Sequence, residues 1–125
     1  MDITQEFGPG SYRIRGYEPG RIVINDRGYT GSLIVTPDRL EPEWPPRTLA
    51  DVQRPHLESI VALQPEVVLL GTGQRLRFPG PELMAFFLER RIGIEAMDTA
   101  AACRTFNVLM AEGRAVAAAL LMDQS

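Results

Sequence analysis

The chain has 125 residues, 45% of them hydrophobic and 23% charged, so we expect one globular domain rather than a disordered chain. Its net charge of −3 argues against a general nucleic-acid or anionic-membrane binder, because such proteins present a basic surface. All 13 basic residues are arginine, which excludes catalysis by a lysine base or a lysine Schiff base.

Three features of the sequence bear on the cell compartment. Cys103 is the only cysteine, which favours a reducing compartment and argues against a structural zinc site. No run of about 18 apolar residues is present, and the N-terminal residues lack the pattern of a signal peptide. We therefore predict a cytoplasmic protein without a membrane span, a metal or a cofactor.

The first part of the chain predicts antiparallel strands. Residues 1–9 are expected to be an extended lead-in, and residues 10–35 to hold the strands. The strands expected from alternating apolar residues are 11–15, 21–25 and 29–35. Residues 25–28, N-D-R-G, favour a turn, and Gly31 predicts a bulge inside the third strand.

Residues 36–54 predict a proline-rich loop that contains Trp44. This side chain either covers the edge of the core or anchors a partner protein, since tryptophan is frequent at interface hot spots. Residues 55–121 predict an α/β half. Its expected elements are helix 55–62, strand 65–70, a helix that starts at Gly80–Pro81 and ends at Gly93, strand 94–97, helix 99–112 and strand 115–121.

This order of elements predicts the fold class. Strands linked by single helices pair in parallel by default, whereas the N-terminal strands are antiparallel. We therefore expect one α/β domain with a central mixed sheet, in which N-terminal antiparallel strands are followed by a βαβαβ unit.

The clearest candidate for a binding site is the glycine-rich loop after the buried strand. Gly71, Thr72 and Gly73 follow that strand directly, and Arg75 and Arg77 come next. Ligands of α/β sheets bind at the carboxyl ends of strands, and arginine together with backbone N–H groups suits an anion. The motif matches neither a dinucleotide-binding nor a P-loop pattern, so the glycines either make a tight turn or line a small-ligand site.

Two further residues are candidates for chemistry. Cys103 lies four residues into its predicted helix, where the helix dipole favours a thiolate, but it is also on the rim of the inward face. His56, the only histidine, is either an exposed residue of a helix start or a base near Asp51 or Glu58. The sequence contains no metal-ligand spacing and no catalytic triad pattern, so we predict no catalytic residue.

Four segments together resemble a known family. They are V-V-L-L-G-T-G at 67–73, G-I-E-A-M-D-T at 93–99, A-C-R-T-F-N-V-L at 102–109 and E-G-R-A-V-A-A-A-L at 112–120. The chain resembles, over residues 20–121, a family of small domains of unknown function that includes the mitochondrial respiratory complex I (NADH dehydrogenase) assembly factor 3.

The resemblance implies a three-layer (β+α)/β/α domain, with helices on one side of the sheet and further strands plus a helix on the other. It implies an assembly role for the mitochondrial relative and offers no catalytic residue. Family members commonly carry tyrosine where Phe106 stands, which favours a packing role for this ring.

Two hypotheses follow for function. The first is a non-enzymatic binding or assembly module with a protein partner, which could also form a homo-oligomer through an open strand edge. The second is a small-molecule or anion-binding protein, or a weak enzyme, that uses residues 71–77.

Overall fold

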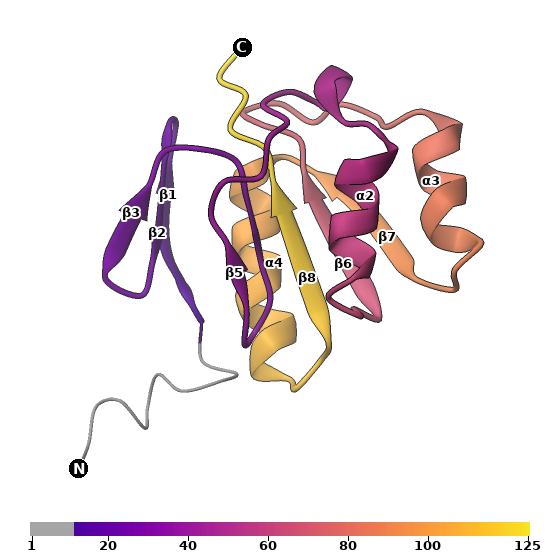
Figure 1. The fold of residues 1–125 in the computed structure, drawn as a ribbon. Helices are drawn as coiled ribbons and strands as arrows, with labels where there is room; N and C mark the ends of the chain where they lie inside the picture. The colour runs from indigo at the N-terminus through magenta and orange to yellow at the C-terminus, as the bar shows by residue number, and fades with distance from the viewer. Residues whose placement is uncertain (1–11) are drawn as a thin grey trace.

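The computed structural model describes residues 12–125 and has three layers (Figure 1). The predicted lead-in at residues 1–9 lies outside the described residues. The central layer is a five-stranded sheet in the order β5-β4-β8-β6-β7. Its strands are β4 (Leu33–Val35), β5 (Leu40–Glu41), β6 (Val67–Gly71), β7 (Gly93–Met97) and β8 (Val116–Leu120).

The pairing of these strands confirms the predicted mixed sheet. β6 is parallel to both β7 and β8, as the two helical crossovers require. β4 is antiparallel to β8 and to the two-residue strand β5. β8 therefore joins the parallel half of the sheet to the antiparallel half.

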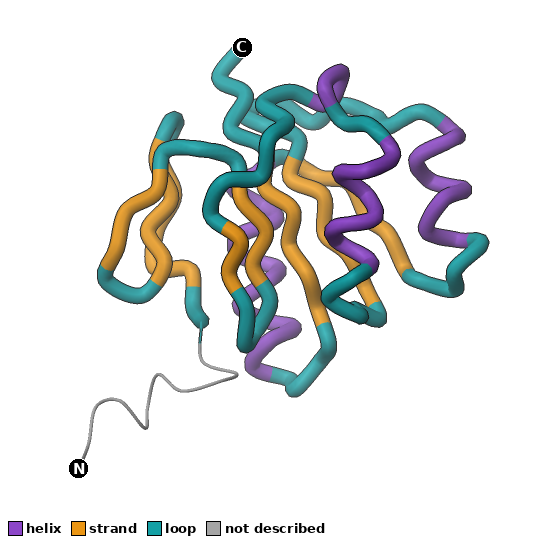
Figure 2. The backbone as a smooth tube through the Cα atoms, in the orientation of Figure 1, coloured by secondary structure: helices purple, strands orange, loops and turns teal. Residues whose placement is uncertain are grey.

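Helices cover both faces of the central sheet, as Figure 2 shows in purple. α2 (Arg54–Val61) and α3 (Pro81–Leu88) cover the face that is nearer the viewer in Figure 1. α4 (Thr99–Ala111) covers the other face together with a three-stranded antiparallel sheet. That sheet consists of β1 (Ile14–Glu18), β2 (Arg21–Ile24) and β3 (Arg27–Tyr29). The expected (β+α)/β/α arrangement is confirmed.

β6 and β8, two of the three inner strands, show why the sheet forms two cores. All five residues of both β6 and β8 are buried, which agrees with strands covered on both faces. Because side chains alternate, Leu69 packs toward α4, whereas Leu70 packs toward α2 and α3. Ala118 of β8 leaves room on the α4 face for Phe106, which is 0% exposed.

The N-terminal strands differ from the expected ones in two places. In the described residues the first strand begins at Ile14 and continues through Gly16, with a bulge between Ile14 and Gly16. The hairpin that it forms with β2 turns at Pro19–Gly20. The expected strand 29–35 is wrong as one element, because it divides into β3 and β4, which belong to different sheets. Gly31 lies in the crossing between them and not in a bulge.

Two expectations in the middle of the chain also need correction. The proline-rich loop contains β5 and a short 3-10 helix at Leu49–Asp51, which Thr48 caps. The α3 helix ends at Leu88 and not at Gly93, which starts β7 instead. Arg91 takes the left-handed backbone conformation, with a φ of 58°, in the turn between them.

Asn107 fixes the three-stranded sheet to α4. Its side-chain Oδ1 accepts a hydrogen bond from the backbone N–H of Ile14 at 2.9 Å. Its Nδ2 donates to the carbonyl oxygen of Ile14 at 2.6 Å. One amide side chain thus satisfies both backbone groups of a β1 residue, as a neighbouring strand would.

Candidate functional site

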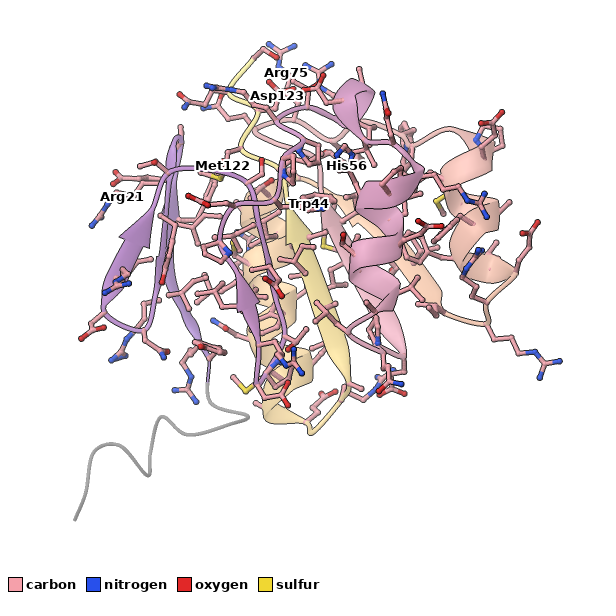
Figure 3. All side chains as sticks on the ribbon, in the orientation of Figure 1. Arg21, Trp44, His56, Arg75, Met122 and Asp123 are labelled. Atoms are coloured by element: carbon pink, nitrogen blue, oxygen red, sulfur yellow. The ribbon has the colours of Figure 1, made fainter. Side chains whose placement is uncertain are left out.

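The glycine-rich loop lies at the carboxyl end of β6, at the molecular edge where Figure 3 labels Arg75 and Asp123. Its first backbone donors are used inside the molecule. The N–H of Thr72 donates to the carbonyl of Met97, and the N–H of Gly73 donates to Oγ1 of Thr99 at 2.8 Å. The N–H of Gln74 donates to the carbonyl of Asp123 at 3.0 Å. These three groups therefore do not point at a ligand.

The Thr72 hydroxyl organises the loop from within. The side chain is fully buried, and its Oγ1 donates to the carbonyl of Arg75 at 2.7 Å. The same oxygen accepts a hydrogen bond from the N–H of Arg77 at 3.0 Å. Thr72 consequently fixes the path of residues 75–77 and does not face solvent.

The two glycines are required by close packing. A Cβ at Gly71 would lie 2.9 Å from Oγ1 of Thr99 and 3.1 Å from Cδ2 of Leu120. Gly73 has a φ of 111°, and a Cβ there would lie 2.6 Å from the carbonyl oxygen of Asp123. The close approach that glycine permits is thus made by Thr99, Leu120 and Asp123 of the chain itself.

The two arginines of the loop have different surroundings. Nε of Arg77 lies 3.6 Å from Oδ2 of Asp123, and its Nη2 donates to the carbonyl of Ser125. Hydrogen bonds from Ser125, together with the nearby Arg77, hold the pKa of Asp123 below its usual value. Arg75 is exposed and makes no ion pair within residues 12–125. Its guanidinium is therefore the group of this loop that is available to a binding partner.

Apolar side chains alternate with these arginines. Phe78 is 82% exposed and Leu76 is 48% exposed, so two large hydrophobic groups face solvent on one short loop. The sequence pattern predicts a site at the glycines and arginines but not at Leu76 or Phe78. The alternation R-L-R-F outside any predicted strand was the available signal. We call residues 75–78 the edge loop.

Trp44 and His56 lie beside each other below this edge, as Figure 3 shows. Trp44 is only 5% exposed, and its Nε1 donates to the carbonyl of His56 at 3.4 Å. Nδ1 of His56 accepts a hydrogen bond from the N–H of Gln53 at 2.9 Å, which caps the start of α2. Trp44 thus closes the core instead of offering a surface anchor, and His56 has a structural partner.

Cys103 lies inside the packed face of α4. It is 4% exposed, and burial raises the pKa of its thiol to about 12. Burial is also the main cause of the raised pKa of Tyr17, with the neighbouring Cys103 second. A thiol with such a pKa is protonated at neutral pH and is a poor nucleophile. Within the described residues, no group of His, Cys, Asp and Glu gathers to hold a metal ion.

Known proteins with similar sequences include one named as an assembly factor and one named as a membrane protein. A Xenopus tropicalis protein named "NADH dehydrogenase [ubiquinone] 1 alpha subcomplex assembly factor 3" is 32% identical over 113 residues, which is 89% of this chain. The matched region spans 61% of that relative's length. The "13 kDa major membrane protein" of Francisella tularensis is 28% identical over 97% of this chain and 99% of its own length.

A solved structure and a family model also match this chain. The NMR structure of a Xanthomonas campestris protein is 42% identical, with a TM-score of 0.81 over 89% of this chain and 84% of that chain. None of the helices in residues 12–125 is long and apolar enough to cross a membrane. The model of the family described as "Protein of unknown function (DUF498/DUF598)" matches residues 14–121, and the chain belongs to this family.

Proposed function

We propose that the chain is a non-enzymatic binding module that takes part in assembling a membrane-associated protein complex. The edge loop contacts the protein partner. The observation that carries this proposal is the exposure of Phe78 and Leu76 beside Arg75, which makes no ion pair with any residue from 12 to 125. Aromatic residues and arginine are the side chains that most often dominate the energy of protein interfaces.

The loop is held in place from beneath, which favours binding. Thr72 bonds to both Arg75 and Arg77, and Arg77 also contacts Asp123. A surface that is ordered before binding loses less conformational entropy when the partner docks. The edge loop therefore suits a partner that is held by a few anchoring side chains.

The names of two relatives support a role in assembly at a membrane. One relative is named as an assembly factor of a respiratory complex and another as a membrane protein. The internal use of the backbone donors at Thr72, Gly73 and Gln74 favours the module over the alternative of an anion-binding loop. Self-association through an open strand edge stays a separate prediction.

Affinity purification tests the proposal. Protein tagged at the N-terminus is recovered from native cell extract, with membranes solubilised in mild detergent, and its partners are identified by mass spectrometry. We expect subunits or assembly intermediates of one membrane-associated complex with the wild type. We expect their loss with Phe78→Ser, because an exposed aromatic anchor is removed.

Val108→Ser is the matched control, because Val108 is an exposed apolar residue on α4, away from the edge loop. It should retain every partner. If Phe78→Ser retains the same partners as the control, the edge loop is not the binding surface. If no membrane-complex subunit is enriched with the wild type, the assembly role itself is wrong.

A further inference from the structure

A groove lies between α2 and α3, the two helices that cover one face of the central sheet. Its volume is about 580 Å³, and the 3-10 helix closes one side of it. Its apolar lining comes from Leu49, Val52, Leu57, Leu83, Ala85 and Phe86. Charged and polar side chains complete the lining. A groove with an apolar part and a charged part suits an amphipathic helix.

The α3 wall of the groove carries two carboxylates at a regular spacing. Glu82, Ala85, Phe86 and Glu89 all line it, and their spacing of three, four and seven residues places them on one side of the helix. Glu82 and Glu89 are both exposed. They lie two helical turns apart, which is about 10 Å along the axis.

The opposite wall adds little positive charge. Arg54 of α2 lines the groove, but its Nε lies 3.5 Å from Oε2 of Glu58. Its guanidinium carbon also lies 5.4 Å from the centre of the Phe86 ring. Because Glu58 offsets the charge of Arg54, Glu82 and Glu89 give the residues that line the groove a net negative charge.

The floor of the groove is fixed before any partner arrives. Arg90 stacks over the Phe86 ring at 3.7 Å, and its Nη1 donates to the carbonyl of Phe86 at 2.7 Å. Phe86 also packs edge-on against Phe87, with 5.2 Å between ring centroids. Phe86 is therefore held in place before a partner binds, and its ordering costs the complex no conformational entropy.

We propose that this groove binds one amphipathic helix of a partner protein, with lysine or arginine at positions seven residues apart. The apolar face of that helix fills the groove, and its two cations pair with Glu82 and Glu89. The inference rests on the proposed function in taking a protein as partner, but it uses a different surface from the edge loop. A chain with both surfaces would hold two protein segments together, as an assembly module must.

A synthetic peptide provides the probe. We would use a fluorescein-labelled 18-residue helix of leucine and lysine, with lysines seven residues apart, and a matched peptide with glutamate in place of lysine. Fluorescence anisotropy should show binding of the lysine peptide and much weaker binding of the glutamate peptide. In ¹⁵N-labelled protein, the peptide should shift amide signals of α2 and α3.

Charge reversal on the groove tests the specific residues. The double variant Glu82→Lys, Glu89→Lys should weaken binding of the lysine peptide at least about tenfold. The matched control, Glu95→Lys with Glu112→Lys, changes the net charge equally at two other exposed positions and should bind as the wild type does. Glu89→Lys alone should weaken binding while preserving the fold, because a cation at the end of α3 suits the helix dipole.

Several outcomes would overturn the inference. They are equal losses of binding in the groove and control variants, no binding of the lysine peptide, and signal shifts confined to residues that do not line the groove. A dimer in sedimentation experiments that Glu89→Lys dissociates would show that a second copy occupies the groove instead. Phe78→Ser should leave peptide binding unchanged, so a failure here is distinguishable from a failure of the edge-loop proposal.

Discussion

The two faces of the central sheet are covered in different ways. On one face, the 13-residue helix α4 packs Phe106 into the core, and a separate sheet covers the rest. On the other face, two eight-residue helices lie beside each other with a groove between them. The same strands thus support two packed cores, and only the layer of two short helices has a groove at its surface, which we propose for binding.

Local sequence accounts for this difference. The run of small residues Ala117, Ala118 and Ala119 in β8 lets helices approach both faces closely. On one face α4 packs Phe106 into that room, and Asn107 then bonds to β1. On the other face α3 buries Phe87 in the cluster that contains Ala117 and Ala119. β6 lies between α2 and α3 in the chain, so no short connection joins these two helices.

The largest effect should come from the face that α4 covers. Phe106→Ala removes a fully buried ring and should lower the free energy of unfolding by about 4 kcal/mol, from lost burial and the remaining cavity. Phe78→Ala removes the same group from an exposed position and should change stability little. Urea unfolding followed by circular dichroism measures both. Similar losses of unfolding free energy in the two variants would contradict the burial of Phe106 and the exposure of Phe78.

The next largest effect should come from Gly73, in the turn that follows β6. Gly73→Ala places a Cβ 2.6 Å from the carbonyl oxygen of Asp123 at a φ of 111°. Backbone strain and overpacking together should cost about 3 kcal/mol. Gly31→Ala is the control, because a Cβ there meets nothing within 4 Å. Thermal and urea unfolding would show whether the two variants differ as expected.

A smaller effect should appear at high pH through Cys103. Burial raises the pKa of its thiol from 9.0 to about 12 in the folded protein, so the unfolded chain loses the proton first. The stability that this thiol contributes is therefore complete below pH 9 and is lost as the pH rises toward 12. Relative to Cys103→Ala, the wild type should lose about 2 kcal/mol of unfolding free energy between about pH 9 and 11. If the two proteins lose stability equally as the pH rises, the Cys103 thiol is more exposed to solvent than the structure shows.

The smallest effect should come from the wall of the groove. Leu83 is only half-buried, so Leu83→Ala should cost about 1 kcal/mol of stability. The same change should weaken binding of the lysine peptide, because Leu83 lines the groove. Calorimetry and anisotropy on one protein preparation separate the two effects. A loss of stability as large as that of Phe106→Ala would mean that Leu83 is packed as deeply as Phe106 and does not line an accessible groove.

The α/β half could be predicted from sequence because its signals are local. Asp98 caps α4 by accepting a hydrogen bond from the N–H of Ala101 at 2.8 Å, as a capping residue does. The division of residues 29–35 could not be predicted, because Leu33 pairs with Leu120, far along the chain. The same reason applies to Gly73, whose close neighbour is Asp123 and not a ligand.

The candidate sites show a similar limit. The order of residues 75–78 was visible, but exposure of Phe78 depends on the burial of Thr72 beneath the loop. His56 is placed by a side-chain contact to the backbone of Gln53, which sequence spacing does not reveal. The groove depends on how far apart two helices lie, and no pattern within either helix encodes that separation.

The contact between Asn107 and Ile14 also blocks the edge of β1 at Ile14, where a strand from another molecule would pair. Exposed strand edges recruit strands from other molecules, and the outer edge of β1 would otherwise present both backbone groups of Ile14. The amide of Asn107 occupies these groups and ends the sheet with a side chain that cannot be extended further. Replacement by leucine would leave α4 intact but would open this edge to pairing between copies during folding and at high concentration.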